Sequence, residues 1–318
     1  MDYEPVTHTT TDRRLGHFPS GRDISVTVHR YSGGDGPTVF VQAAQHGIEL
    51  NGPAALRRLH SHLVDADFAG SVVAVPVVNP IAFDHRSYLT PEAYDALNSN
   101  FNRIWPGDAD GSFQERLVAG VWPLVEAADV AIDLHTGTPE MLEHVRFRQS
   151  DPMAETLAEA FGTESLLADD DPIDEDDDFT GKFRLAAARA GVPAITAELS
   201  NSRTVRRPAV QAGVDGVWNV LCELDVVDDA AEPAAEQRRL RDDAPRVVAD
   251  DSGLFELRAD LGVGDVVDAG EELGAVFDPS SFERLATVTA SASGVIYSVA
   301  RGGVVVAGER IASIATQS

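Results

Sequence analysis

Two histidines and a glutamate in this sequence have the types and spacing of metal ligands. His46 and Glu49 lie three residues apart in GlnHisGlyIleGluLeuAsnGly, and on a helical turn this spacing puts both side chains on one face. His135 ends a second apolar run, in IleAspLeuHisThrGly. A lone His-x-x-Glu pair is more often a solvated surface feature. Together, however, two histidines and one carboxylate form the ligand set of some catalytic zinc sites, which keep one position open for water.

A further carboxylate and two arginines offer the rest of a hydrolytic site. Glu198 ends an apolar run, where a carboxylate is costly to bury unless it has a partner or a task. Beside a zinc-bound water it would act as general base and then protonate the leaving amine; the alternative is a strand-end residue turned to solvent. Arg86 and Arg103 lie in loops rich in Asn, Pro and Gly. A guanidinium there can bind a carboxylate or stabilise an oxyanion, although either arginine alone would be a simple surface residue.

Alternating apolar strands and helical patterns predict the elements that position these residues. The predicted strands are residues 37–44, 71–78, 128–135 and 192–199, and the predicted helices are residues 52–63, 113–122 and 183–190. Near-continuous apolar strands separated by helices indicate an α/β fold with a mainly parallel twisted sheet and helices on both faces. In such sheets the site lies at the carboxyl ends of the strands, which is where these polar residues fall.

The last third of the chain has a different character. Residues 1–225 are predicted to form the catalytic domain, 226–250 a linker or connecting helix, and 251–318 a β-rich domain. A weak repeat, in which a Ser-Gly-apolar segment leads to Ala-Gly-Glu, predicts a small C-terminal barrel or sandwich. Lipoyl and biotin carrier domains have this pattern, but they carry their cofactor on a lysine. Residues 251–318 contain no lysine, so we expect a packing or gating module.

The charge composition argues against several classes of partner. The 318 residues include 52 Asp and Glu against 25 Lys and Arg, a formal charge of −27, and Lys182 is the only lysine. This composition predicts a salt-adapted, haloarchaeal protein that does not bind nucleic acid or anionic membrane. No apolar run reaches the roughly 18 residues of a membrane span, and no signal segment begins the chain, so we expect a cytoplasmic protein. The acidic run 169–178 is interpreted as a solvated loop.

Five motifs in order resemble the succinylglutamate desuccinylase/aspartoacylase family, which belongs to the zinc carboxypeptidase-like fold. They are HGIELNG, NPIAFDHR, NRIWPG, DLHTGT and the strand-end glutamate. The resemblance covers about residues 35–205, and the β-rich tail fits the family's second domain. It implies one Zn²⁺ per chain held by His46, Glu49 and His135, with Glu198 as the catalytic carboxylate.

The resemblance also implies roles for the loop residues. Arg86 would polarise the substrate carbonyl, and Asn102 and Arg103 would bind a substrate carboxylate. Trp105 stands where the family usually has Phe, which is expected to alter the pocket wall. Tyr297 is a candidate for a substrate-contacting tyrosine by composition only, and we expect it not to contribute.

Five further polar side chains carry weaker signals. Asp133 shares the strand face of His135 and would orient a ligand imidazole, or else bond to backbone. His60, His62, His85 and His144 lack paired ligand spacing and are interpreted as structural or surface residues.

The sequence therefore predicts a zinc-dependent amidohydrolase that cleaves a small N-acyl amino acid or related amide. One alternative is a metallocarboxypeptidase acting on peptides, which a domain capping the site would disfavour. Another, from a different class, is a non-catalytic homologue that binds a metal or ligand. The acyl group, the amine and the oligomeric state, including a homo-oligomer, stay open.

Overall fold

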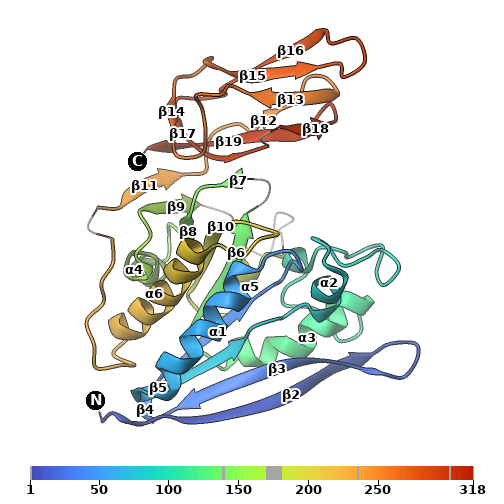
Figure 1. Ribbon diagram of the computed structural model, residues 1–318. Coiled ribbons are helices and arrows are strands. Elements are labelled where there is room, and N and C mark those ends of the chain that lie inside the picture. Colours follow the sequence, from blue (N-terminus) through green and yellow to red (C-terminus); the bar gives the residue numbers. More distant parts are fainter. Residues whose placement is uncertain (1, 138–139, 170–180, 235, 301, 318) are drawn as a thin grey trace.

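A central parallel run organises the larger sheet. The computed structural model describes residues 2–137, 140–169, 181–234, 236–300 and 302–317. Four neighbouring parallel strands form the middle of the sheet (Figure 1): β5 (Asp67–Val75), β4 (Gly34–Ala43), β6 (Val130–Gly137) and β10 (Ala194–Asn201). These are the four predicted strands, shifted by a few residues, and the predicted α/β class is confirmed.

Further strands extend this run on both sides and make the sheet mixed. An N-terminal hairpin lies antiparallel beyond β5, and a second parallel group lies beyond β10, which pairs antiparallel with β8. The hairpin strands are β2 (Thr7–His17) and β3 (Asp23–Ser32), and β1 (Glu4–Pro5) pairs with β5. The second group is β8 (His144–Arg148), β9 (Ser165–Asp169) and β11 (Arg238–Arg241).

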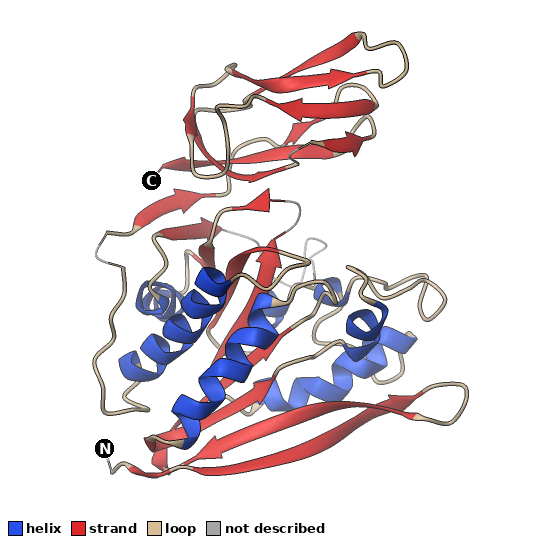
Figure 2. Cartoon of the chain, in the orientation of Figure 1, coloured by secondary structure: helices blue, strands red, loops and turns tan. Residues whose placement is uncertain are grey.

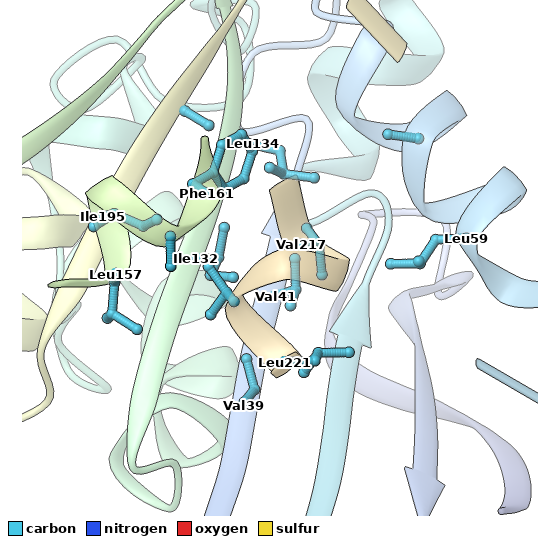
Figure 3. Close-up of a cluster of buried hydrophobic side chains, with 14 of the residues drawn as sticks. Val39, Val41, Leu59, Ile132, Leu134, Leu157, Phe161, Ile195, Val217 and Leu221 are labelled. Carbon is cyan, nitrogen blue, oxygen red and sulfur yellow. The ribbon is translucent and has the colours of Figure 1, made fainter. Parts of the chain in front are cut away.

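Helices cover both faces of the sheet, because alternate strand residues point to opposite sides. On one face, Val39 and Val41 belong to an apolar core that residues of α1 (Asn51–Val64), α4 (Pro152–Phe161) and α6 (Arg207–Glu223) share, as Figure 3 shows. On the other, Phe40 belongs to a second apolar core that residues of α2 (Pro80–His85), α3 (Phe113–Glu126) and α5 (Phe183–Arg189) share. No described helix is long and apolar enough to cross a membrane.

The C-terminal part is built from strands (Figure 2), and it has its own apolar core. One antiparallel sheet holds β13 (Gly253–Leu257), β15 (Glu272–Phe277), β16 (Arg284–Thr289) and β18 (Gly303–Val305). The strands β7 (Glu140–Met141), β12 (Val247–Val248), β14 (Val266–Val267), β17 (Gly294–Val299) and β19 (Arg310–Gln317) pair with one another and with β11. The predicted β-rich tail is confirmed. The described residues of 226–250 form loops, β11 and β12, and no helix.

Candidate active site

The first two candidate ligands lie in the turn between β4 and α1. His46 and Glu49 precede the helix, which begins at Asn51, so they share a turn and not a helix face. The Glu49 amide donates to the His46 carbonyl at 3.2 Å, which closes the turn. A Cβ at Gly47 would stand 2.0 Å from the carbonyl oxygen of Ala82, so only glycine lets the turn pass this close to α2.

Glu49 lies between the two histidines. Its Oε1 is 2.9 Å from His46 Nδ1, and its Oε2 is 3.0 Å from His135 Nδ1. The Thr136 amide also donates to Oε2, at 3.1 Å. The three side chains are buried, and one ligand atom from each lies within 4.8 Å of the others. The structure therefore brings together the three candidate ligands that were predicted from the sequence.

The other ring nitrogen of each histidine, Nε2, also has a polar partner. His135 Nε2 is 2.8 Å from Asp133 Oδ2, and His46 Nε2 is 3.2 Å from Asn100 Oδ1. Metal-binding histidines are typically oriented in this way, through a hydrogen bond from the nitrogen that does not bind the ion. The donor set fits a zinc ion bound by two Nδ1 atoms and the Glu49 carboxylate. Asp133 orients His135 as predicted, whereas Asn100, in a loop without periodicity, was missed.

Charge is concentrated at this point. Burial opposes ionisation of Glu49, but His46 and His135 outweigh it and lower the pKa of Glu49 to about 2. Burial likewise opposes protonation of His135, while Asp133 and Glu49 hold its pKa well above the ordinary value. The two buried carboxylates, Glu49 and Asp133, face two imidazoles, and such a group suits a bound cation.

Glu198 is placed beside His135 by the sheet register. The two residues pair across the neighbouring parallel strands β10 and β6, and both line one cavity. Burial raises the pKa of Glu198 above its ordinary value, Glu49 raises it further, and His135 opposes the change. A carboxyl with a raised pKa, next to the candidate metal ligands, is a stronger base than an ordinary glutamate.

The cavity has a volume of ≈ 220 Å³, and its lining residues come both from the part of the chain up to β10 and from the C-terminal part. Its lining includes the cationic side chains Arg103, Arg146, Lys182, Arg184, Arg246 and Arg310. Arg146 is 2.9 Å from Asp242 and 3.7 Å from Asp169, and Arg184 forms two hydrogen bonds with Asp169. A carboxylate-bearing ligand suits this lining.

The C-terminal part contributes directly to the cavity. Tyr297 on β17 lines it, and the Tyr297 hydroxyl donates to Asp242 Oδ1 at 2.7 Å. Arg246 and Arg310 come from the same part of the chain. The expectation that Tyr297 stays away from the site is therefore wrong. The strands after β11 do more than pack, because they form one wall of the cavity.

The predicted loop residues divide into two groups. Asn102 and Arg103 line the cavity: Asn102 Oδ1 accepts from the Phe183 amide at 2.8 Å, and the Arg103 guanidinium donates to the Asn102 carbonyl. Arg86, by contrast, is exposed at the end of α2 and is not among the cavity-lining residues. Tyr88 lines the cavity instead, and its ring stacks on His46 at 4.1 Å between centroids. Sequence reasoning missed Tyr88.

Trp105 lies behind the candidate ligands and is not among the residues that line the cavity, which corrects the expectation for this position. It is 1% exposed, and its indole Nε1 donates to Gln45 Oε1 at 2.7 Å. Gln45 Nε2 in turn donates to Asp133 Oδ2 at 2.6 Å, and Asp133 contacts His135. Phenylalanine has no donor, so it could not hold Gln45 in this way.

We expect Trp105→Phe to lower zinc affinity about 10-fold and to destabilise the fold by about 1–3 kcal/mol, because Gln45 Oε1 would lose its buried partner. Trp122→Phe is the matched control: this ring lies 6.1 Å from Trp105 but forms no hydrogen bond within the described part of the chain. Zinc titration and urea unfolding of both variants measure the difference. Equal losses of zinc affinity would show that ring area, and not the hydrogen bond, matters.

Residues 35–224 match the family model for the succinylglutamate desuccinylase/aspartoacylase catalytic domain. The chain belongs to this family. The predicted family is thus confirmed, and the match supports a hydrolase of the deacylase type. The family match covers β4 to α6, which carry His46, Glu49, His135 and Glu198.

Individual relatives agree with this assignment. The N-alpha-acetyl-L-2,4-diaminobutyric acid deacetylase of Halomonas elongata is 29% identical over 262 residues, covering 80% of this chain and 74% of that protein. A succinylglutamate desuccinylase/aspartoacylase structure from Rhodobacter sphaeroides has a TM-score of 0.85 at 24% identity and covers 100% of this chain and 97% of its own. The product-bound ectoine utilization protein EutE (DoeB) from Ruegeria pomeroyi has a TM-score of 0.83 at 22% identity, covering 98% of this chain and 99% of its own. The two structures share the fold over both parts of the chain.

Proposed function

We propose that this protein is a zinc-dependent deacylase that hydrolyses the amide bond of a small N-acyl amino acid. One observation carries the proposal: the His46–Glu49–His135 cluster and Glu198 line the same cavity, whose wall is rich in arginine. A bound zinc ion would supply the Lewis acid that makes a water molecule nucleophilic near neutral pH. His46, Glu49 and His135 would hold it.

Glu198 would move the proton. Its carboxylate takes a proton from the attacking water, whose oxygen bonds to the acyl carbon. When the C–N bond breaks, the same carboxyl gives the proton to the departing amine nitrogen. The raised pKa of Glu198 makes both steps accessible at one pH, since the group is then neither a very weak base nor a very weak acid.

Tyr88 would stabilise the oxyanion that forms on the acyl oxygen. Its ring lies against His46, and although Tyr88 as a whole is 40% exposed, partial burial and the charge of Glu49 raise the pKa of its hydroxyl. The phenol therefore stays protonated and can donate a hydrogen bond to a developing negative charge. This is the role that the family resemblance gave to Arg86, which is exposed and absent from the cavity lining.

We expect Tyr88→Phe to lower kcat by about 100-fold, the usual effect of removing one oxyanion donor. Arg86→Ala should leave kcat within about two-fold, because its side chain does not line the cavity. Steady-state kinetics of both variants, with zinc content checked, compares the two roles directly. A large loss for Arg86→Ala with little loss for Tyr88→Phe would restore the role first predicted for the arginine.

The charge of the cavity indicates a substrate with a carboxylate. The chain as a whole carries a formal charge of −27, yet cationic side chains gather at this site. Arg103 and Asn102 both line the cavity and would orient a substrate carboxylate. The relative from Halomonas elongata acts on N-alpha-acetyl-L-2,4-diaminobutyric acid, so N-acetylated amino acids with this backbone carboxylate are the first candidates.

A substrate panel tests this function. The zinc-loaded protein, in high salt, is given N-alpha-acetyl-2,4-diaminobutyrate, N-acetylaspartate, N-succinylglutamate and short peptides, and the free amine released is measured. Hydrolysis of at least one acyl amino acid, at a kcat/KM at least 10-fold above that for the peptides, is expected. Faster cleavage of the peptides would favour the metallocarboxypeptidase alternative. Zinc binding without any hydrolysis would favour the non-catalytic homologue.

A further inference from the structure

A second cluster of histidines lies away from the cavity, between the N-terminal hairpin and α1. His8 is on β2, His29 is on β3 and His60 is on α1. One ring nitrogen from each lies within 4.8 Å of the other two, and all three side chains are half-buried. None of the three lines the cavity that holds Glu198.

The sheet register and helix packing bring these residues together. β2 and β3 pair His8 with Tyr31 and Thr10 with His29, so His8 and His29 are diagonal neighbours on one face. α1 covers this face, where Tyr31 packs in the same apolar core as the buried leucines of the helix. The helix thereby places His60 above the two strand histidines. His60, interpreted from sequence as a structural or surface residue, is thus part of a cluster.

The contacts within the cluster are close to those of a metal site. His8 Nε2 is 3.1 Å from His29 Nδ1. Two nitrogens bound to a tetrahedral zinc ion, at about 2.0–2.1 Å each, lie about 3.3 Å apart. The third ring needs to approach, but its edge already faces His8, with 4.9 Å between centroids. One ring nitrogen from each histidine already lies within 4.8 Å of the other two, so the proposed ion requires only a further approach of the rings.

One ring is also held in the way that metal-binding histidines are. The Tyr31 hydroxyl is 2.8 Å from His60 Nδ1, which leaves Nε2 of His60 for another partner. Tyr31 is 3% exposed, so its position is fixed by the core. In the described part of the chain, none of the three histidines forms an ion pair with a carboxylate. The three rings mainly contact one another. Three imidazoles this close cannot all be protonated without strong repulsion.

We propose that His8, His29 and His60 bind a divalent transition-metal ion, such as Zn²⁺ or Ni²⁺, at a site distinct from the catalytic cavity. Imidazole nitrogens are suitable ligands for both ions, and three of them leave a fourth position for water. Because the ligands come from β2, β3 and α1, the ion fixes the N-terminal hairpin to the helix that follows the His46 turn. The expected effect of this ion is therefore on the stability of the fold.

The test first removes His46, one of the three candidate ligands at the cavity, so that binding at that site is weakened and the histidine cluster can be counted. In the His46→Ala protein, equilibrium dialysis is expected to find about one Zn²⁺ or Ni²⁺ per chain, and Co²⁺ should give the visible absorption of a tetrahedral site. Adding His29→Ala should weaken binding at least 100-fold. Adding His62→Ala should not, because His62 lies on the same helix but contacts Trp218 instead.

Two further readouts separate loss of the ion from loss of the fold. In the His46→Ala protein, Ni²⁺ should raise Tm by about 5 °C, and this rise should vanish with His29→Ala or with His8→Asn. The Tm without metal should stay within about 2 °C for His8→Asn, whose side chain is only half-buried. The proposal is overturned if the His46→Ala protein binds no ion, or if the added His29→Ala leaves the affinity unchanged.

Discussion

Replacing Glu198 with glutamine is expected to lower kcat by about 10²–10⁴-fold while leaving zinc binding intact. The amide has almost the same shape, but it can neither accept the proton of the attacking water nor return it to the amine. Glu198 is not one of the three clustered ligands; it stands beside His135 on the neighbouring strand. Steady-state kinetics on the best acyl amino acid, together with metal analysis of the same samples, measure both parts of the prediction.

Glu143→Gln provides the control for this substitution. Glu143 lies next to β8, the strand that pairs with β10 near Glu198, but it does not line the catalytic cavity. Its replacement should change kcat by less than about two-fold. If the metal-loaded Glu198→Gln protein cleaves acyl amino acids as fast as the parent, proton transfer by Glu198 is excluded, and another group of the cavity must perform it.

The sheet and the meeting of His46, Glu49 and His135 could be predicted from the sequence for one physical reason. Strands buried on both faces are nearly continuous apolar runs, and polar residues that end them stand out. His135 and Glu198 end two such runs, which the structure pairs in register. Parallel order then brings the turn after β4, with His46 and Glu49, to the same edge of the sheet.

Other parts depend on tertiary contacts that leave no periodic signal. The hairpin strand β2 is polar and largely exposed, as an edge strand tolerates, so its sequence does not alternate clearly. Tyr88 and Asn100 lie in the long connection between α2 and α3. They contact His46 only because this connection passes over it, and the sequence does not show that path. Arg86 is the opposite case. Its motif predicts a place in the site, but in the structure it ends α2 and is exposed to solvent.

Glu49→Gln is expected to lower zinc affinity more than 100-fold, beyond the effect of removing an outer hydrogen bond to a ligand. Glu49 is the anionic member of the cluster, and the Nδ1 atoms of His46 and His135 both face its oxygens. Glutamine would replace one oxygen with a donor that cannot bind the ion. The affinity is measured by zinc titration in the His29→Ala protein, so that the second histidine cluster does not contribute.

The same substitution at Glu198 is the matched control for Glu49→Gln. Both carboxylates line one cavity, and both lose a charge, but the geometry gives them different tasks. Glu49→Gln should lose zinc and activity together, and excess zinc should restore part of the activity. Glu198→Gln should keep zinc and lose activity, which added zinc cannot restore. If Glu49→Gln kept full zinc affinity while Glu198→Gln lost it, the ligand and proton-transfer roles would have to be exchanged.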